Sequence, residues 1–327
     1  MTAPVCDKTA NPGSMNNPSM QRPKIIVLCG PTGIGKTGMS LALARRLNGG
    51  IVSADSMQIY RYMDIGTAKP DEAQQAAAPH YMIDVAEPDE SYDAARYARE
   101  AGNAILKLKN QEKLPLVVGG TGLYIKALLY GLFKSSPSRP QLRQRLRKEA
   151  DQKVGKYLHD KLTSCDPVAA GRIHPNDTYR IIRALEVYEL TGRPISEYQQ
   201  NHGFSDSRFH ALKIGLHLER RQLYEQINLR VEKMLEDGLL EEVRELIDMG
   251  YSPELKSMQS LGYRHMTDYL GGSLCWRDAV EQMKTDTRRY AKRQLVWFRN
   301  DPEMLWMAPD DVDYACSRIQ KFLSPLG

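Results

Sequence analysis

The sequence predicts an α/β fold: a P-loop NTPase-like core with a parallel sheet, interrupted by a helical insertion domain. Strand-length apolar runs alternate with helical patterns over the first 130 residues. No strand pattern is evident between Pro140 and Asn201, and an alternating strand pattern returns at Phe209–Leu218. We therefore expect a disordered leader (1–22), a discontinuous core (23–136 and 205–327) and a helical insertion (137–204).

A glycine-rich loop, Gly30–Thr37, follows the first apolar run, Ile25–Cys29, and precedes a helical pattern. It fits the P-loop pattern G-x-x-x-x-G-K-[ST] in its required context of strand, loop and helix. The glycines allow the backbone N–H groups to converge, and the helix N-terminus and Lys36 add positive charge. Thr37 offers a hydroxyl to Mg²⁺. The predicted phosphate site consists of Gly30, Pro31, Thr32, Gly33, Ile34, Gly35, Lys36 and Thr37.

Asp55 ends the second predicted strand, Ile51–Asp55. Ligands of open α/β sheets bind beyond the carboxyl ends of the strands, so Asp55 is expected at the same crevice as the P-loop. The alternative interpretation is that Asp55 only caps the turn that follows it.

The rest of the first half supplies a third strand (Tyr81–Val85), a helix (Tyr92–Asn110) and a fourth strand (Leu114–Val118). The fourth strand runs into Gly119–Tyr124, where ATP-hydrolysing P-loop enzymes often carry an acidic residue. Two glycines and Thr121 stand there instead, and glycines let another backbone or a flat ligand approach closely.

The insertion is predicted to contain a charged helical run, Gln141–Leu162, and a helix that begins at Asp177 and continues to Leu190. Arg143, Arg180 and Arg183 lie on these helices, and their plainest interpretation is a solvated charged surface. After the returning strand the pattern predicts helices at Glu219–Val231, Leu239–Met249 and Trp276–Arg299, with a short helix following Ser257–Arg264.

The helix Trp276–Arg299 is strongly basic. Between residues 284 and 299 it has six Lys or Arg residues against one acid, Asp286, a local charge of +5. Like charges at i,i+4 (Arg289 and Arg293) destabilise an isolated helix, and a polyanion relieves that repulsion. The pattern favours nucleic acid. The alternative is that Trp297 and Phe298 are core residues and the basic face pairs with acids elsewhere.

Composition limits the class of protein only loosely. The chain has 327 residues, a net charge of +5 and a pI of about 8.8, which is compatible with nucleic acid but not diagnostic. Its five scattered cysteines argue against a zinc site and a disulfide scaffold. No apolar run has the length of a membrane span. We expect a cytoplasmic, monomeric protein without membrane contact.

The ordered motifs resemble the tRNA dimethylallyltransferases (the MiaA family of tRNA isopentenyltransferases) from about Lys24 to beyond Arg299. The segments that carry the resemblance are Gly30–Thr37, Asp55–Gln58, Asp64–Lys69, Val118–Tyr124, His174–Asp177, Arg180–Glu186, Leu261–Arg264 and Lys292–Arg299. Gly33-Ile34 stands where many members have Ala-Ser; the loop backbone does the binding, so we expect little effect. Eukaryotic members often add a zinc finger, and none follows here, so the chain looks like the bacterial form.

The resemblance implies transfer of a dimethylallyl group from dimethylallyl diphosphate to N6 of adenosine 37, beside the anticodon of tRNAs that read codons beginning with U. It implies Asp55 as the group that orients and deprotonates the amine, with Thr32 assisting. It implies a diphosphate held by the P-loop, Arg220 and Mg²⁺ near Thr37. It implies tRNA contacts from Asp55, Ser56, Met57, Gln58, Thr121, Arg143, Tyr179, Arg180, Ile181, Ile182, Arg183, Gln259, Gly262, Tyr263, Arg264, Lys292, Arg293, Gln294, Trp297 and Arg299.

Three other functions remain open from the residues. A small-molecule kinase would use ATP on the same P-loop but leaves the insertion and the basic helix unexplained. A non-catalytic RNA-binding protein would show no turnover. A relative that prenylates free adenine nucleotides would need neither the insertion nor the basic helix.

Overall fold

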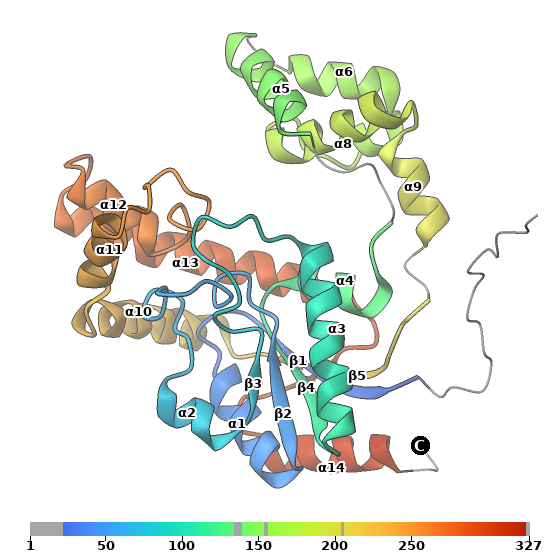
Figure 1. The fold of residues 1–327 in the computed structure, drawn as a ribbon, viewed down its shortest axis with the longest axis vertical. Helices are drawn as coiled ribbons and strands as arrows, with labels where there is room; N and C mark the ends of the chain where they lie inside the picture. The colour runs from blue at the N-terminus through green and yellow to red at the C-terminus, as the bar shows by residue number, and fades with distance from the viewer. Residues whose placement is uncertain (1–21, 134–138, 154–155, 204–205, 325–327) are drawn as a thin grey trace, which may run out of the picture.

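The computed structural model describes residues 22–133, 139–153, 156–203 and 206–324. The expected disordered leader, apart from Arg22, therefore lies outside the described residues. Six parallel strands form one sheet in the order β3-β2-β4-β1-β5-β6 (Figure 1). Their bounds are β1 Lys24–Cys29, β2 Gly49–Ser53, β3 His80–Tyr81, β4 Leu114–Gly119, β5 His210–Leu216 and β6 Leu305–Met307. The predicted α/β fold with a parallel sheet is confirmed.

The sheet is buried on both faces because side chains of each strand alternate between two hydrophobic clusters. Along β1, Val27 and Cys29 join the cluster covered by α3 (Ala94–Asn110) and α4 (Gly122–Tyr130). Ile26 and Leu28 join the cluster on the opposite face. That face is covered by α1 (Lys36–Arg46) and α14 (Val312–Leu323). Since β1 lies between β4 and β5, the loop that follows it opens at the centre of the sheet edge.

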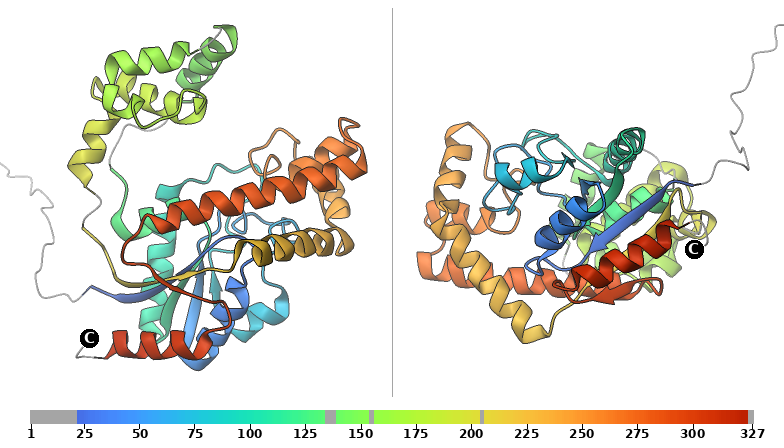
Figure 2. Two further views of the ribbon diagram at one scale, coloured as in Figure 1. Left: turned by 180° about the vertical axis from the view of Figure 1, so that it is seen from behind. Right: turned by 90° about the horizontal axis from the view of Figure 1, so that it is seen from below.

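Among the described residues of the insertion there are helices and no strand: α5 (Pro140–Gln152), α6 (Tyr157–Cys165), α7 (Pro167–Ala170), α8 (Thr178–Thr191) and α9 (Ile195–His202). They enclose a small core of their own, which includes Leu146, Leu162 and Leu185. Figures 1 and 2 show this group standing apart from the sheet, beyond the ends of α3 and α4. The chain then returns to the same sheet, where β5 pairs with β1.

The remaining helices are α2 (Glu72–Ala77), α10 (Arg220–Glu236), α11 (Leu239–Asp248), α12 (Tyr263–Leu270) and α13 (Trp276–Arg299). The bounds of α13 are those the pattern predicts. The long helix α13 crosses the carboxyl-end edge of the sheet and lies beside α10 (Figures 1 and 2). Two predictions need correction. The charged run Gln141–Leu162 is divided between α5 and α6, and the third strand is shorter than expected.

The third strand ends at Tyr81 instead of Val85 because the backbone turns over at the next residues. Met82 and Asp84 have φ values of +66° and +56°, in the left-handed region that no strand can use. The backbone N–H of Val85 then donates to the carbonyl of Ile59 instead of continuing the sheet ladder. The apolar residues after Tyr81 therefore belong to a folded loop and not to a strand.

Candidate active site at the P-loop

The glycine loop between β1 and α1 wraps around Lys36. Gly33 and Gly35 have φ values of +79° and +94°, a conformation that favours glycine. A Cβ added to Gly33 would lie 3.0 Å from a side-chain carbon of Ile227 on α10, so the loop also needs glycine for close packing. The Nζ of Lys36 donates to the carbonyls of Gly30 (3.1 Å) and Pro31 (2.7 Å). The ammonium group of Lys36 is therefore held inside the loop, at the start of α1.

Two cations share this place. Burial, together with the charge of the neighbouring Arg230 of α10, lowers the pKa of Lys36 to about 8, and Asp55 opposes the change. Burial also lowers the pKa of Arg230, again opposed by Asp55. Neither Lys36 nor Arg230 forms an ion pair with any described residue. A dianion at the loop would relieve their repulsion, so the electrostatics fit a phosphate or diphosphate group.

Asp55 lies at the same site and also caps its own turn. Its Oδ1 accepts hydrogen bonds from the backbone N–H groups of Met57 (2.8 Å) and Gln58 (3.4 Å), so the capping interpretation is correct as well. Oδ2 accepts no hydrogen bond from the described residues. Asp55, Lys36 and Thr37 line one cavity of about 50 Å³. The carboxylate is thus fixed through one oxygen while the other is available at the loop.

The glycine turn after β4 allows three close approaches. A Cβ on Gly119 would lie 2.2 Å from the carbonyl oxygen of Ala54, next to Asp55. At Gly120 and Gly122 it would lie 2.1 Å from the side chains of Gln294 and Trp297, respectively. Both of those side chains come from α13. The predicted close approach is confirmed, and the approaching groups are the Asp55 turn and the basic helix.

Helix α13 therefore has two sides. Its buried side includes Gln294 and Phe298, while Lys292, Arg293 and Arg299 are exposed. Trp297 retains 43% of its surface exposed. Phe298 is therefore a core residue, as one interpretation predicted, whereas Trp297 is only partly buried. Most of the basic face is open to solvent.

The structure divides the residues predicted to contact RNA into three groups. Four of them have buried side chains: Ile181, Ile182, Tyr263 and Gln294. Some side chains are engaged within the protein: Gln58 with Ser53 and Ala68, Thr121 with Ser56, Gln259 with Pro253, Arg264 with Asp286, and Arg143 and Arg183 with Glu186. The exposed members are Tyr179, Arg180, Lys292, Arg293, Trp297 and Arg299. Ser56 and Met57 are half-buried beside Asp55, and Gly262 is buried with a φ of +89°.

Glu186 explains why two of the arginines are held in place. Its carboxylate has 0% of its surface exposed and accepts hydrogen bonds from Arg143 at 2.9 and 3.0 Å and from Arg183 at 2.6 Å. Burial raises the pKa of Glu186, but the hydrogen bonds from the two guanidinium groups outweigh it and leave the pKa below its ordinary value. The pairs are therefore part of the architecture of the insertion.

Two residues at the site, Arg230 and His80, were not among those predicted from the sequence. Arg220, the predicted clamp, is exposed, and its guanidinium lies 5.1 Å from the ring centroid of Tyr224. Arg230 is the α10 arginine whose charge acts on Lys36 and Asp55, one turn beyond the loop contact of Ile227. His80 lines the Asp55 cavity and donates its Nδ1–H to the carbonyl of Ala78 at 2.8 Å. Only the position of His80 at a strand beside β2 could have signalled it.

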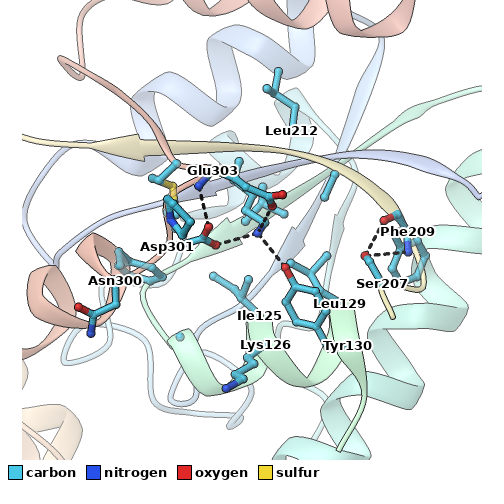
Figure 3. Close-up of a pocket in the computed structure, with 18 of the residues that line it drawn as sticks. Ile125, Lys126, Leu129, Tyr130, Ser207, Phe209, Leu212, Asn300, Asp301 and Glu303 are labelled. Carbon is cyan, nitrogen blue, oxygen red and sulfur yellow. Dashed lines mark hydrogen bonds and ion pairs between the residues drawn. The ribbon is translucent and has the colours of Figure 1, made fainter. Parts of the chain in front are cut away.

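A much larger cavity lies elsewhere in the described residues. It has a volume of about 1190 Å³ between α4, β5 and the end of α13, and it shares no lining residue with the Asp55 cavity. Figure 3 shows Tyr130, Asp301 and Glu303 converging on one amine, which is the Nζ of Lys213, each at 2.8 Å. Burial opposes the charge of Lys213, but these partners outweigh it and raise its pKa. The amine of Lys213 is therefore fully engaged by these three partners.

Comparison with known proteins identifies a family and several close relatives in sequence and structure. Residues 58–301 match the family model described as IPP transferase. A tRNA dimethylallyltransferase of Desulfosudis oleivorans is 57% identical over 88% of this chain and 91% of its own length. A solved tRNA isopentenylpyrophosphate transferase of Bacillus halodurans is 39% identical, with a TM-score of 0.67 over 93% of this chain and 96% of its own. A eukaryotic dimethylallyltransferase, solved acting on tRNA, is 30% identical, with a TM-score of 0.75 over 92% of this chain and 77% of its own.

The chain belongs to the IPP transferase family, that of the tRNA dimethylallyltransferases. The expected resemblance to the bacterial tRNA dimethylallyltransferases is thereby confirmed. Within the described residues, no helix combines the length and the apolar character needed to cross a membrane.

Proposed function

We propose that this chain transfers the dimethylallyl group of dimethylallyl diphosphate to N6 of adenosine 37 in tRNAs that read codons beginning with U. The product is N6-dimethylallyladenosine. The observation that carries the proposal is the shared cavity of Lys36, Thr37 and Asp55, which brings an anion site and a fixed carboxylate together. Membership of the family supplies the class of reaction.

The P-loop is the proposed site of the diphosphate leaving group. Charge develops on the diphosphate as its allylic C–O bond breaks, and preorganised cations and N–H groups stabilise that charge. Lys36, Arg230 and the loop N–H groups supply them here. Arg220 remains a second candidate for the clamp.

Mg²⁺ is the proposed cofactor. It usually binds through one or two protein oxygens together with substrate phosphates, so a complete protein cage is not required. The hydroxyl of Thr37 lines the cavity beside Lys36 and fits that role. When bound, Mg²⁺ neutralises charge on the diphosphate. Among the described residues, no group of three or more His, Cys, Asp or Glu side chains is arranged to bind a metal by itself.

Asp55 is the proposed base for the adenine amine. The lone pair of that amine is delocalised into the ring, so a positioned carboxylate that accepts its proton favours attack on the allylic carbon. Thr32, whose backbone lies in the loop next to α13, is the proposed helper. An adenine in an anticodon loop must leave its stack to reach such a cavity, and contacts elsewhere on the RNA compensate for that cost.

The proposed RNA surface combines the exposed side of α13 with the exposed residues of α8. Lys292, Arg293 and Arg299 give α13 an open basic face, and Tyr179 on α8 has 67% of its surface exposed. Arginine and lysine contact phosphates, and exposed aromatic rings stack on bases. A cytoplasmic monomer remains the expectation for the working form.

A small-molecule kinase is the second candidate, and it fits less well. It accounts for the P-loop but for neither the helical insertion nor the basic side of α13. No acidic residue follows β4, where Gly119, Gly120 and Thr121 stand.

The deciding experiment incubates the pure chain with labelled dimethylallyl diphosphate, Mg²⁺ and unmodified tRNA, and then analyses the nucleosides. We expect label on N6 of the adenine that follows the anticodon. Asp55→Ala should lower turnover by about a hundredfold or more, the usual scale for a lost general base, while tRNA binding persists. Transfer of phosphate from ATP to a small acceptor, without prenyl transfer, would support the kinase instead.

A further inference from the structure

Gln294 is a buried polar residue whose two ends join separate parts of the active site. Its side-chain oxygen accepts a hydrogen bond of 2.8 Å from the backbone N–H of Thr32 in the P-loop. Its side-chain nitrogen donates to the carbonyl of Gly120, after β4, at 2.9 Å. Only 6% of the residue is exposed. Gln294 therefore belongs to the loop side of α13, although the sequence placed it among residues that contact RNA.

One peptide unit of the P-loop is held from both sides. The Pro31–Thr32 peptide presents its carbonyl to the Nζ of Lys36 at 2.7 Å and its N–H to Gln294. When a diphosphate binds the ammonium group of Lys36, the hydrogen bond from Lys36 to the Pro31 carbonyl weakens. The hydrogen bond to Gln294 is then what keeps this peptide from turning, because the conformationally free Gly33 follows immediately.

The same helix presents its basic side to solvent. Lys292 and Arg293 immediately precede Gln294 and are exposed, and Arg289 has 70% of its side chain exposed. An α-helix is stiff over this distance, so a contact on one side constrains the other. RNA seated on the basic side would hold α13, and through Gln294 the P-loop peptide, in one position.

We propose that Gln294 is a positioning residue that couples RNA binding on α13 to diphosphate binding at the P-loop. The inference rests on the proposed function, because it takes the basic side of α13 as the RNA surface. Gln294 itself touches neither substrate. Its amide aligns a loop peptide, and the coupling must act in both directions, since linkage between two binding sites is reciprocal.

The test uses the full chain, inorganic diphosphate as an unreactive probe, and an unmodified anticodon stem-loop. Diphosphate affinity is measured by titration calorimetry with and without saturating RNA. In the wild type, RNA should tighten diphosphate binding about fivefold or more, the lower end of ordinary coupling. Gln294→Met keeps the length of the side chain but loses both hydrogen bonds. It should bring that ratio to within about twofold of one and raise the KM for dimethylallyl diphosphate about tenfold.

Two further variants separate positioning from general damage. Thr287→Val removes a hydrogen bond to the carbonyl of Met283 on the same buried side of α13, and it should leave the ratio unchanged. Gly120→Ala places a Cβ 2.1 Å from the side-chain nitrogen of Gln294, so it should reproduce the loss of coupling with Gln294 intact. RNA affinity in the absence of diphosphate should stay within about twofold in all three variants.

A coupling ratio in Gln294→Met that equals the wild-type ratio would overturn the inference, as would a wild type in which RNA leaves diphosphate affinity unchanged. Prenyl transfer by the wild type identifies which proposal has failed. If transfer occurs and coupling does not depend on Gln294, only this inference is wrong. If no transfer to tRNA occurs at all, the proposed function fails and the inference fails with it.

Discussion

Diphosphate affinity should fall as pH rises through 8, because the buried amine of Lys36 loses its proton there. Burial, with the charge of Arg230 second, lowers the pKa of Lys36 from 10.5 to about 8, and Asp55 opposes the shift. Lys36 is therefore about nine-tenths charged at pH 7 and about one-tenth charged at pH 9. An anion binds the charged form, so binding is present below pH 8 and weakens above it. If only that form binds, affinity drops about tenfold between pH 7 and pH 9.

The other groups near Lys36 leave this window clear. Burial raises the pKa of Cys29 to about 12, and burial lowers that of His80, so both stay neutral from pH 7 to pH 9. The terminal phosphate of dimethylallyl diphosphate loses its last proton near pH 6, as a phosphorylated side chain does. The charge of the ligand is therefore constant across the range.

The assay is calorimetric titration of dimethylallyl diphosphate at pH 7, 8 and 9, at fixed ionic strength and without RNA. Lys36→Arg is the matched control, because a guanidinium stays charged throughout and its curve should be flat. Wild-type affinity that stays within about twofold over the range would refute the reasoning. So would a Lys36→Arg curve as steep as that of the wild type.

Three further predictions concern arginines and the carboxylate that holds two of them. Arg230→Gln should raise the KM for dimethylallyl diphosphate about tenfold or more while Arg220→Gln leaves it within about twofold, and the reverse order in steady-state assays would restore Arg220 as the clamp. Changing Arg289 and Arg293 together to Ala should lower the slope of log affinity against log salt for tRNA by about one to two, and an unchanged slope would place the RNA elsewhere. Glu186→Gln leaves two guanidinium groups without their buried carboxylate, so it should destabilise the insertion by about 2–4 kcal/mol. Hydrogen exchange should then accelerate in α5 and α8 but not in α1. Equal changes in all three helices would contradict the prediction.

The parts of the fold that sequence predicted are those in which local pattern and local geometry coincide. The P-loop is read directly from its glycines and Lys36, and α13 from an uninterrupted helical period between Trp276 and Arg299. The predicted bounds of the third strand were wrong because two residues with left-handed backbone, Met82 and Asp84, interrupt an apolar run that looks extended. Left-handed backbone at residues other than glycine leaves no mark in the hydrophobic period.

The site itself was only half visible in the sequence, because its second half depends on which side of a helix meets the loop. Arg220 and Arg230 are both arginines of one charged helix, and their spacing does not say which of them faces Lys36. Contact between Ile227 and Gly33 decides it, since Arg230 is one turn further along α10. Gln294 was likewise hidden within a basic run, where its neutral side chain gave no sign that it points inward to Thr32.

The arrangement also explains how a helical insertion can interrupt this core without disturbing the chemistry. The chain leaves the core after α4 and re-enters beside it, where the backbone N–H of Arg208 donates to the carbonyl of Leu129 at 2.7 Å. The two connections are therefore adjacent, and the insertion supplies its own hydrophobic core around Leu162 and Leu185. Neither contributes to the cavity of Lys36 and Asp55. Substitutions in the insertion should consequently change how RNA is held and leave diphosphate binding in the absence of RNA as it was, whereas α13 touches both processes because its two sides face different partners.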